Sequence, residues 1–445
     1  MTNLPARQLP QTEPPPRDLH ARAGVPHRRW LIATLLGAGV LVNYLDRVNV
    51  SVSQDALHAA FGLTIRQFGF LLSAYNWTYC ALQIPSGFLL DRYGVPKIGR
   101  IGTFIWSVAS FCSAGAIGTS SMFASRFLLG VGEAPTFPAC AKAIGYWFPR
   151  SERSLSTAIF DSAAKMGPAI GVPIMGLVLL RFGWRWSFAT TGIISFVYFL
   201  AFFAFYRNPS GDRRLTADER QFILDGDAHV EAAPGVRQKI PFARMLRQKK
   251  VIGLLLGYAS YNYTFYLLLG WLPSYFSKSL DIDLRQSVLY TSVPWGVGAI
   301  VELIVGGWLV NALIHRGWDA SRVRQTVLVG GTSLGLGILG AANARTPASA
   351  LMWITISMAG LSAAAPVGWS IPALIAPERG VGTLGGILNT TNQMAAIVSP
   401  IVAGYIVDRT HSFSLVFAVA AAILLCGVAA YIFWLGRIEP IPDAT

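Results

Sequence analysis

The stretch GFLLDRYGVPK, from Gly87 to Lys97, joins two apolar segments of the chain through a short charged turn. Gly87 allows close approach of a neighbouring helix, and Asp91, Arg92 and Gly94 follow at fixed spacing. A degenerate echo, GGWLVNALIHRG, occupies residues 306–317. Because the two stretches hold equivalent places in the two halves of the chain, they indicate two parallel structural repeats.

The same stretch has the composition of a gating loop. Asp91 can accept hydrogen bonds from amides at a neighbouring helix end, and Arg92 and Lys97 can pair with acids on the facing half of the molecule. Such a charged latch stabilises one of two conformations and breaks in the other. The alternative, that Arg92 and Lys97 are only basic loop residues that fix membrane topology, does not account for the ordered spacing of Gly, Asp, Arg and Gly.

The composition around this motif is that of a membrane protein. The 445 residues have a mean hydropathy of +0.48, and 13% of them are charged, against about 25% in an average soluble domain. Runs of roughly 20 apolar residues, long enough to cross a bilayer, predict twelve transmembrane helices in two pseudo-symmetric six-helix bundles. They lie near residues 30–52, 67–90, 98–117, 121–146, 155–180, 185–206, 251–276, 287–314, 325–342, 348–375, 380–407 and 413–435.

Polar segments divide the chain into five predicted regions. These are a disordered tail (1–29), a first bundle (30–206), a charged linker (207–250), a second bundle (251–435) and a short C-terminal tail (436–445). The net charge of +14 is compatible with nucleic-acid binding, but most of the 36 Lys and Arg fall in the tails, the linker and alternate loops. This asymmetry predicts cytoplasmic termini in an inner membrane and no nucleic-acid partner.

Nothing in the sequence indicates an enzyme. The four cysteines fall inside predicted spans without metal-ligand spacing, and the six histidines fall in tails, loops or span ends. We therefore predict no catalytic residue, no cofactor and no metal.

Several charged residues nevertheless lie within predicted spans, where each costs at least about 2.5 to 3.5 kcal/mol at the bilayer centre and marks a functional site by default. Asp46 and Arg47 end the first span, and Arg126 precedes Glu133 by seven residues on the fourth. Two turns of helix place these last two on one face at different depths.

Guanidinium groups that converge in a cavity are suited to a carboxylate, which they bind with two parallel hydrogen bonds. Arg47 and Arg126 are thus predicted to hold an organic anion, and Asp46 and Glu133 to carry protons. The alternative is a static ion-pair network that ties helices together. Asp161 and Lys165, one turn apart, form either an intrahelical pair or a cavity-facing cation that accommodates a second acidic group.

Six phrases of the sequence carry a family resemblance. They are NYLDRVNVSV, RFLLGVGEAPTFPA, YWFPRSERSLSTAIF, FGWRWSF, LLLGWLPSYF and NTTNQMAAIVSPIVAGYIVD. In this order the chain resembles the anion:cation symporter family of the major facilitator superfamily, which includes bacterial sugar-acid transporters for galactonate, glucarate and hexuronate.

The resemblance implies import of an organic anion together with protons by alternating access, with a hexonate, hexuronate or aldarate as the expected substrate. It implies substrate ligands at Tyr44, Arg47, Tyr79, Arg126 and Gln393, with Lys165 as a further candidate, and proton sites at Asp46 and Glu133. Gln393 stands where the family usually has asparagine. The partners expected are a small carboxylate, protons and the lipid bilayer, around a monomer. The alternative is a proton-coupled exporter of drugs or other small molecules on the same fold.

Overall fold

The computed structural model describes residues 27–149, 152–226, 228, 246–280, 282–376, 381–439 and 441. Most of the predicted N-terminal tail, and parts of the predicted linker and C-terminal tail, lie outside these ranges. Within them the chain forms helices and turns, without a strand.

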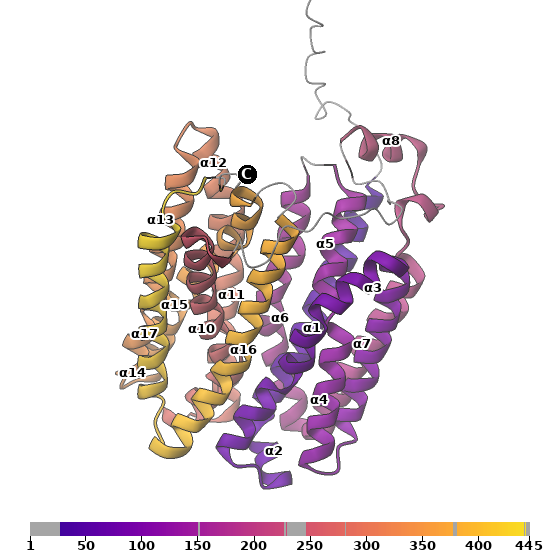
Figure 1. Cartoon of the computed structure of the whole chain (residues 1–445). Helices are drawn as coiled ribbons and strands as arrows, with labels where there is room; N and C mark the ends of the chain where they lie inside the picture. The colour runs from indigo at the N-terminus through magenta and orange to yellow at the C-terminus, as the bar shows by residue number, and fades with distance from the viewer. Residues whose placement is uncertain are drawn as a thin grey trace, which may run out of the picture.

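The helices gather in two bundles joined by the linker (Figure 1). The first bundle contains α1 (Arg28–Val52), α2 (Gln54–Phe61), α3 (Ile65–Ala114), α4 (Thr119–Glu133), α5 (Thr136–Trp147), α6 (Arg153–Phe182) and α7 (Trp184–Phe205). The linker holds the 3-10 turn η2 (Pro209–Gly211) and α8 (Ala217–Asp225). The second bundle contains α10 (Lys249–Ser279), α11 (Leu284–Val301), η3 (Glu302–Leu309), α12 (Val310–His315), α13 (Ala320–Gly335), α14 (Ile338–Ala342), α15 (Pro347–Ile375), α16 (Val381–Thr410), α17 (Ser414–Ala430) and η5 (Tyr431–Leu435).

Local sequence explains where two of the predicted spans begin and end. Helix α3 starts at a capping box in which Thr64 and Gln67 satisfy each other's backbone amides. Its range covers two predicted spans. They are separated at the charged turn, where Gly94, at φ 78° and ψ 161°, interrupts the helix. Such a positive φ is readily adopted only by glycine.

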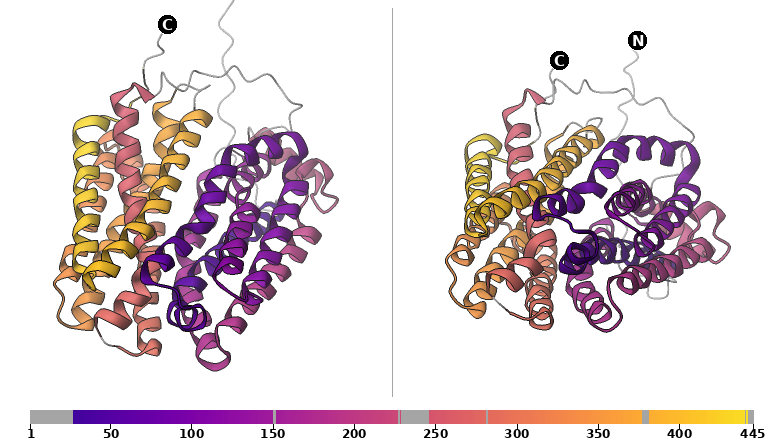
Figure 2. Two further views of the ribbon diagram at one scale, coloured as in Figure 1. Left: turned by 60° about the horizontal axis from the view of Figure 1, so that its bottom comes forward. Right: turned by 90° about the horizontal axis from the view of Figure 1, so that it is seen from below.

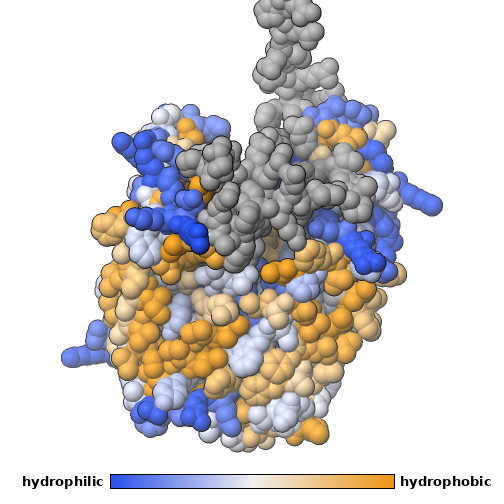
Figure 3. All heavy atoms as spheres, in the orientation of Figure 1, coloured by the Kyte–Doolittle hydropathy of each residue, from blue (hydrophilic) through white to orange (hydrophobic). Residues whose placement is uncertain are grey.

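The outer surface of the bundles is apolar. Over the described residues, seven helices are long and apolar enough to cross a membrane. Figure 3 shows hydrophobic side chains across the middle of one face and hydrophilic ones toward both ends. Large side chains such as Phe433 and Phe182 are 78% and 65% exposed, which is costly in water but favourable in lipid. The chain is therefore a multi-pass membrane protein.

The two bundles meet closely at the end that carries α2 and lie farther apart at the end that carries α8 (Figures 1 and 2). At the α2 end, Gly69 of α3 crosses Gly404 of α16 so tightly that a Cβ on Gly69 would stand 2.6 Å from the carbonyl oxygen of Pro400. Lys278 and Asp55 also form an ion pair of 3.2 Å between the bundles there. The structure is thus closed at the α2 end.

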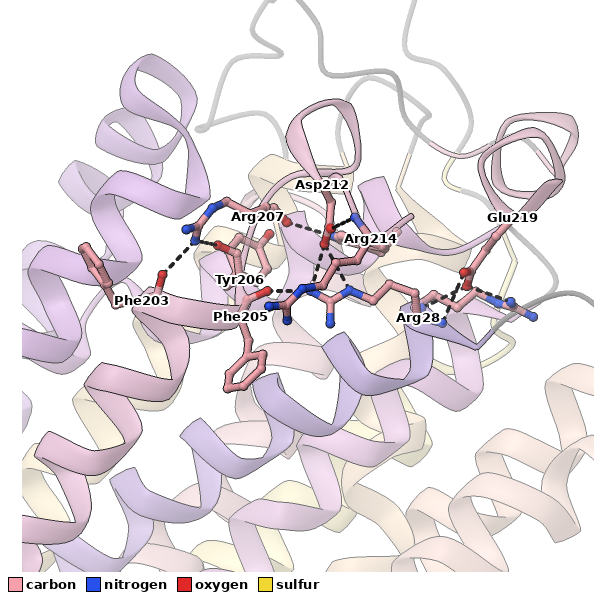
Figure 4. A network of polar contacts seen from close by, with 10 residues as sticks. Arg28, Phe203, Phe205, Tyr206, Arg207, Asp212, Arg214 and Glu219 are labelled. Atoms are coloured by element: carbon pink, nitrogen blue, oxygen red, sulfur yellow. Dashed lines mark hydrogen bonds and ion pairs between the residues drawn. The ribbon is translucent and has the colours of Figure 1, made fainter. Parts of the chain in front are cut away.

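At the opposite end, the linker helix is fastened to the first bundle by ion pairs (Figure 4). Arg28 binds the Asp212 carboxylate at 2.9 Å. Arg29 pairs with Glu219 at 3.1 Å and with Glu152 at 2.7 Å. Glu219 is fully buried and lies in the first turn of α8, where a carboxylate also complements the helix dipole. Helix α8 is therefore held against the start of α1.

Candidate functional site

The centre of the site is an ion pair between α1 and α4. The Nε of Arg47 donates to Oε2 of Glu133 at 2.9 Å, and Nη2 lies 2.8 Å from the same oxygen. Both residues are buried, with 4% and 0% of their surface exposed. Glu133 is the last residue of α4, just before the turn at Pro135 that separates α4 from α5. The pair thus joins two helices of the first bundle.

Aromatic rings surround the Arg47 guanidinium. Its central carbon lies 4.6 Å, 5.0 Å and 5.2 Å from the ring centroids of Tyr44, Tyr75 and Tyr79. A guanidinium over tyrosine faces is stabilised by the ring quadrupoles, and more so when water is excluded. Nη1 of Arg47 also donates to the hydroxyl of Tyr266 on α10 at 3.4 Å. Arg47 is therefore in contact with both bundles.

Arg126 is the second buried guanidinium, 2% exposed on α4. Its Nη1 donates to the backbone carbonyl of Asp46 at 3.3 Å, while its Nε has no hydrogen-bond partner. Its central carbon lies 5.5 Å from the Tyr75 ring, so Tyr75 contacts both guanidinium groups. Among the residues that the structure describes, Arg126 has no ion pair with a carboxylate, and its Nε can donate to a ligand.

Asp46 faces into the first bundle. Oδ1 accepts from the Ser110 hydroxyl at 2.7 Å, and Oδ2 accepts from the Ser195 hydroxyl at 2.8 Å. Asp46 and Arg47 are adjacent, so their side chains leave α1 about 100° apart. Asp46 thus contacts α3 and α7, while Arg47 reaches Tyr266 of α10.

Amide side chains line the contact between α3 and α16. Nδ2 of Asn389 donates to Oε1 of Gln83 at 2.8 Å. Gln393, one turn further along α16, is 6% exposed, and its Oε1 has no hydrogen-bond partner. A buried amide oxygen without a partner is costly unless a ligand or water satisfies it. Gln393 is in this respect suited to the substrate role predicted from the sequence.

Lys165 has a partner that the sequence did not indicate. Its Nζ lies 2.7 Å from Oε2 of Glu302 on η3, so the ion pair links α6 to the second bundle. The sequence left open whether Lys165 faces the cavity or pairs with Asp161. The structure gives a third arrangement, in which Glu302 neutralises the lysine.

The charged turn of α3 differs in part from its prediction. Asp91 pairs with Lys142 of α5 at 2.7 Å, within its own bundle. Arg92 and Lys97 stack on the ring of Tyr93, and over the described residues neither forms an ion pair with the second bundle. The close helix approach expected at Gly87 is also absent, since nothing lies within 4 Å of a Cβ built there. The contacts predicted between this turn and the second bundle are thus not formed over the described residues, and the gating role stays a prediction.

Three site residues were missed by the sequence analysis. Tyr75 precedes Tyr79 by four residues on α3, so helical spacing from Tyr79 was a signal for it. Ser110 and Ser195 hold Asp46 from helices distant in the sequence, and no local pattern distinguishes them from other serines in apolar helices.

Two bundles of apolar helices packed around buried charges are the architecture of a membrane transporter. Residues 36–318 match the family model of the Major Facilitator Superfamily. The chain belongs to this superfamily, and its members are transporters and not enzymes.

Curated relatives match nearly the whole chain. The uncharacterized transporter YybO of Bacillus subtilis (strain 168) is 38% identical over 93% of this chain and 96% of its own length. The probable galactarate/D-glucarate transporter GarP of Escherichia coli (strain K12) is 30% identical, covering 93% and 96%. The D-galactonate transporter of Escherichia coli O6:H1 is 28% identical, covering 95% and 100%. The predicted resemblance to sugar-acid transporters of this superfamily is confirmed.

The fold also matches solved structures. A bacterial homolog of the human lysosomal transporter Spinster, in an inward-facing and occupied conformation, superposes with a TM-score of 0.73. The match covers 94% of this chain and all of the other, at 16% identity. Together with the family model over residues 36–318, this likeness confirms the predicted major facilitator fold.

Proposed function

We propose that this chain is a proton-coupled symporter that imports an organic anion, a sugar acid, by alternating access. The observation that carries the proposal is Arg126, a buried guanidinium without a carboxylate partner in the described part of the chain, next to the Arg47–Glu133 ion pair. Relatives named for galactonate and for galactarate or D-glucarate support a sugar acid as the substrate class.

The anion is expected to bind between the two guanidinium groups. A carboxylate near Tyr75 can accept from the free Nε of Arg126 and compete with Glu133 for Arg47. Tyr44 and Tyr79 flank the same guanidinium, and Gln393 offers an unsatisfied amide to substrate hydroxyls. A cationic drug would meet two buried guanidinium groups, Arg47 and Arg126, which disfavours the exporter alternative.

Protons are expected at Glu133 and Asp46. When a substrate carboxylate takes over Arg47, Glu133 loses its counterion inside an apolar site, and protonation removes the cost of its buried charge. Substrate binding and proton binding then favour each other, which is the coupling that symport requires. Asp46 offers a second carboxyl close to Arg126, held by two serine hydroxyls.

The orientation follows from the basic residues. The end that carries α8 holds the charged linker and is expected to face the cytoplasm of an inner membrane, with both termini on that side. The conformation in Figure 1 is then inward-facing, closed at the outer end by the Gly69–Gly404 crossing. Because one chain contains every group of the proposed site, a monomer is expected to transport.

The test is uptake by proteoliposomes that contain the purified protein. Labelled hexonates, hexuronates and aldarates are offered with an inward proton gradient and, in parallel, with a protonophore. Symport predicts accumulation of at least one acid above equilibrium, abolished by the protonophore and by Arg47→Ala. The proposal is overturned if no acid moves while a lipophilic cation exchanges for protons.

A further inference from the structure

A second charged cluster bridges the bundles outside the proposed anion site. Lys165 of α6 and Glu302 of η3 form an ion pair of 2.7 Å, and each side chain is 4% exposed. Asp161, one turn before Lys165 on α6, interacts with both members of the pair. The cluster therefore holds two carboxyl groups around one ammonium group.

This cluster is close to the proposed anion site. The ring of Phe265 on α10 lies 5.8 Å from Lys165 Nζ and 6.2 Å from the ring of Tyr44. Tyr44 in turn lies 4.6 Å from the Arg47 guanidinium. The Tyr44–Phe265 pair thus adjoins both cations, because Arg47 contacts Tyr44 and Lys165 contacts Phe265.

The two ends of the region between Arg126 and Lys165 differ in the charge that they offer to a substrate. At the first, Arg126 has no carboxylate partner among the described residues, so one substrate carboxylate is well accommodated. At the second, Lys165 is already neutralised by Glu302, and Asp161 adds a further carboxyl. A second carboxylate there meets two acids and no free cation, whereas a neutral hydroxyl group meets only hydrogen-bonding groups.

Taking the proposed function as given, we propose that the site accepts sugar monocarboxylates and discriminates against dicarboxylates, and that Glu302 is the specificity-determining residue. Glu302 does so by occupying the lysine that would otherwise bind the second carboxylate. This reverses the expectation, stated for a cavity-facing Lys165, of a second acidic group on the substrate. The same preference predicts uptake of galactonate over galactarate. These two acids, for which relatives are named, differ in one terminal carboxylate.

The experiment compares acids that differ only at the terminal carbon. Proteoliposomes with the full chain are offered galactonate against galactarate, and gluconate against glucarate, under one proton gradient. The wild-type protein is expected to prefer the monocarboxylate of each pair by about tenfold or more. Glu302→Gln removes one of the two acids beside Lys165, the one in the ion pair, and is expected to raise relative uptake of the dicarboxylate by about tenfold.

Two further variants separate charge from structure. Lys165→Met with Glu302→Gln removes the whole ion pair and is expected to give no gain for dicarboxylates. Asp55→Asn breaks the other ion pair between the bundles, at the α2 end, and is expected to leave the ratio unchanged. If Glu302→Gln does not fold, judged by gel filtration and melting temperature, Glu302→Asp serves in its place, with a smaller shift in the same direction.

The outcomes distinguish the two proposals. If none of the sugar acids is transported by the wild-type protein, the proposed function fails. If sugar acids are transported but dicarboxylates equal or exceed monocarboxylates, the function stands and the inference is wrong. An unchanged ratio in a folded Glu302→Gln or Glu302→Asp protein also overturns the role of Glu302.

Discussion

Arg47 places its Nε and Nη2 on the same carboxylate oxygen of Glu133, and leaves the other oxygen, Oε1, without a hydrogen-bond partner. Only one of the two carboxylate oxygens of Glu133 therefore has a hydrogen-bond partner. A buried oxygen of this kind can take a proton without first losing a hydrogen bond. Glu133 is in this way suited to exchange its counterion for a proton when substrate arrives.

Glu133→Gln is therefore expected to separate binding from coupling. Glutamine keeps the shape of the protonated acid, so substrate exchange across the membrane should continue at a similar rate. Accumulation driven by a proton gradient should fall to equilibrium. Counterflow and gradient-driven uptake measured on the same proteoliposomes check this, and gradient-driven accumulation by the variant would rule out Glu133 as the coupling group.

Arg126→Ala is expected to weaken substrate binding without destabilising the fold. A hydrogen bond to a charged group is worth about 1.5–3 kcal/mol, so the KM should rise about tenfold or more. The melting temperature should change little, because Arg126 forms no ion pair over the described residues and its one hydrogen bond, to the Asp46 carbonyl, is long at 3.3 Å. Arg126→Lys keeps the charge but not the planar donor pair, and should restore only part of the affinity.

The two serine hydroxyls on Asp46 predict different results for two substitutions. Asp46→Asn can still bond both Ser110 and Ser195, because hydroxyl groups also accept, so the protein should fold and lose only its proton dependence. Asp46→Ala leaves the Ser195 hydroxyl unsatisfied and should cost about 1–3 kcal/mol of stability. Melting curves and the pH profile of uptake test both, and equal melting temperatures would contradict the contacts described.

The tight crossing at the α2 end predicts that a larger side chain at Gly69 would force the bundles apart. Gly69→Val adds atoms where even a Cβ would meet the Pro400 carbonyl oxygen, so the bundles should separate at that end and transport should stop. Spin labels at Asp55→Cys and Lys278→Cys, with the native cysteines replaced, should move apart. Gly385→Val on α16 is the control, since nothing lies within 4 Å of a Cβ there, and it should leave the label distance unchanged.

The ion pairs of Figure 4 predict that Glu219 holds the linker helix in place. Glu219→Ala leaves Arg29 with one acid fewer in a buried position, and should cost up to about 3–5 kcal/mol. Cleavage of the linker by a protease should accelerate, and the melting temperature should fall. Asp225→Ala, at the exposed end of the same helix, is the matched control. Equal cleavage of the two variants would show that α8 does not depend on Glu219.

Much of the fold could be predicted from the sequence. Each predicted span is helical over most of its described residues, because hydropathy and length determine which segments cross a bilayer. The break at Gly94 follows from a glycine in a charged turn. The charged residues proposed for the site were found in the same way, since a charge inside an apolar helix stands out in the sequence, whereas Tyr44, Tyr79 and Gln393 came from the family resemblance.

The ion-pair partners of those charged residues could not be predicted from the sequence. Glu133 lies 86 residues from Arg47, and the Lys165–Glu302 pair joins the two halves of the chain. Spacing along one helix favoured Asp161 as the partner of Lys165, and helix packing placed Glu302 closer.

The sequence by itself determined the apolar helices and the charges buried within them, because these depend on local composition and period. Only the tertiary structure decided which acid pairs with which base, which guanidinium has no ion pair over the described residues, and which end of the molecule is closed. Those properties depend on distances of a few ångströms between helices far apart in the chain. Electrostatic energy in an apolar interior changes steeply over such distances, and no pattern along the sequence records them.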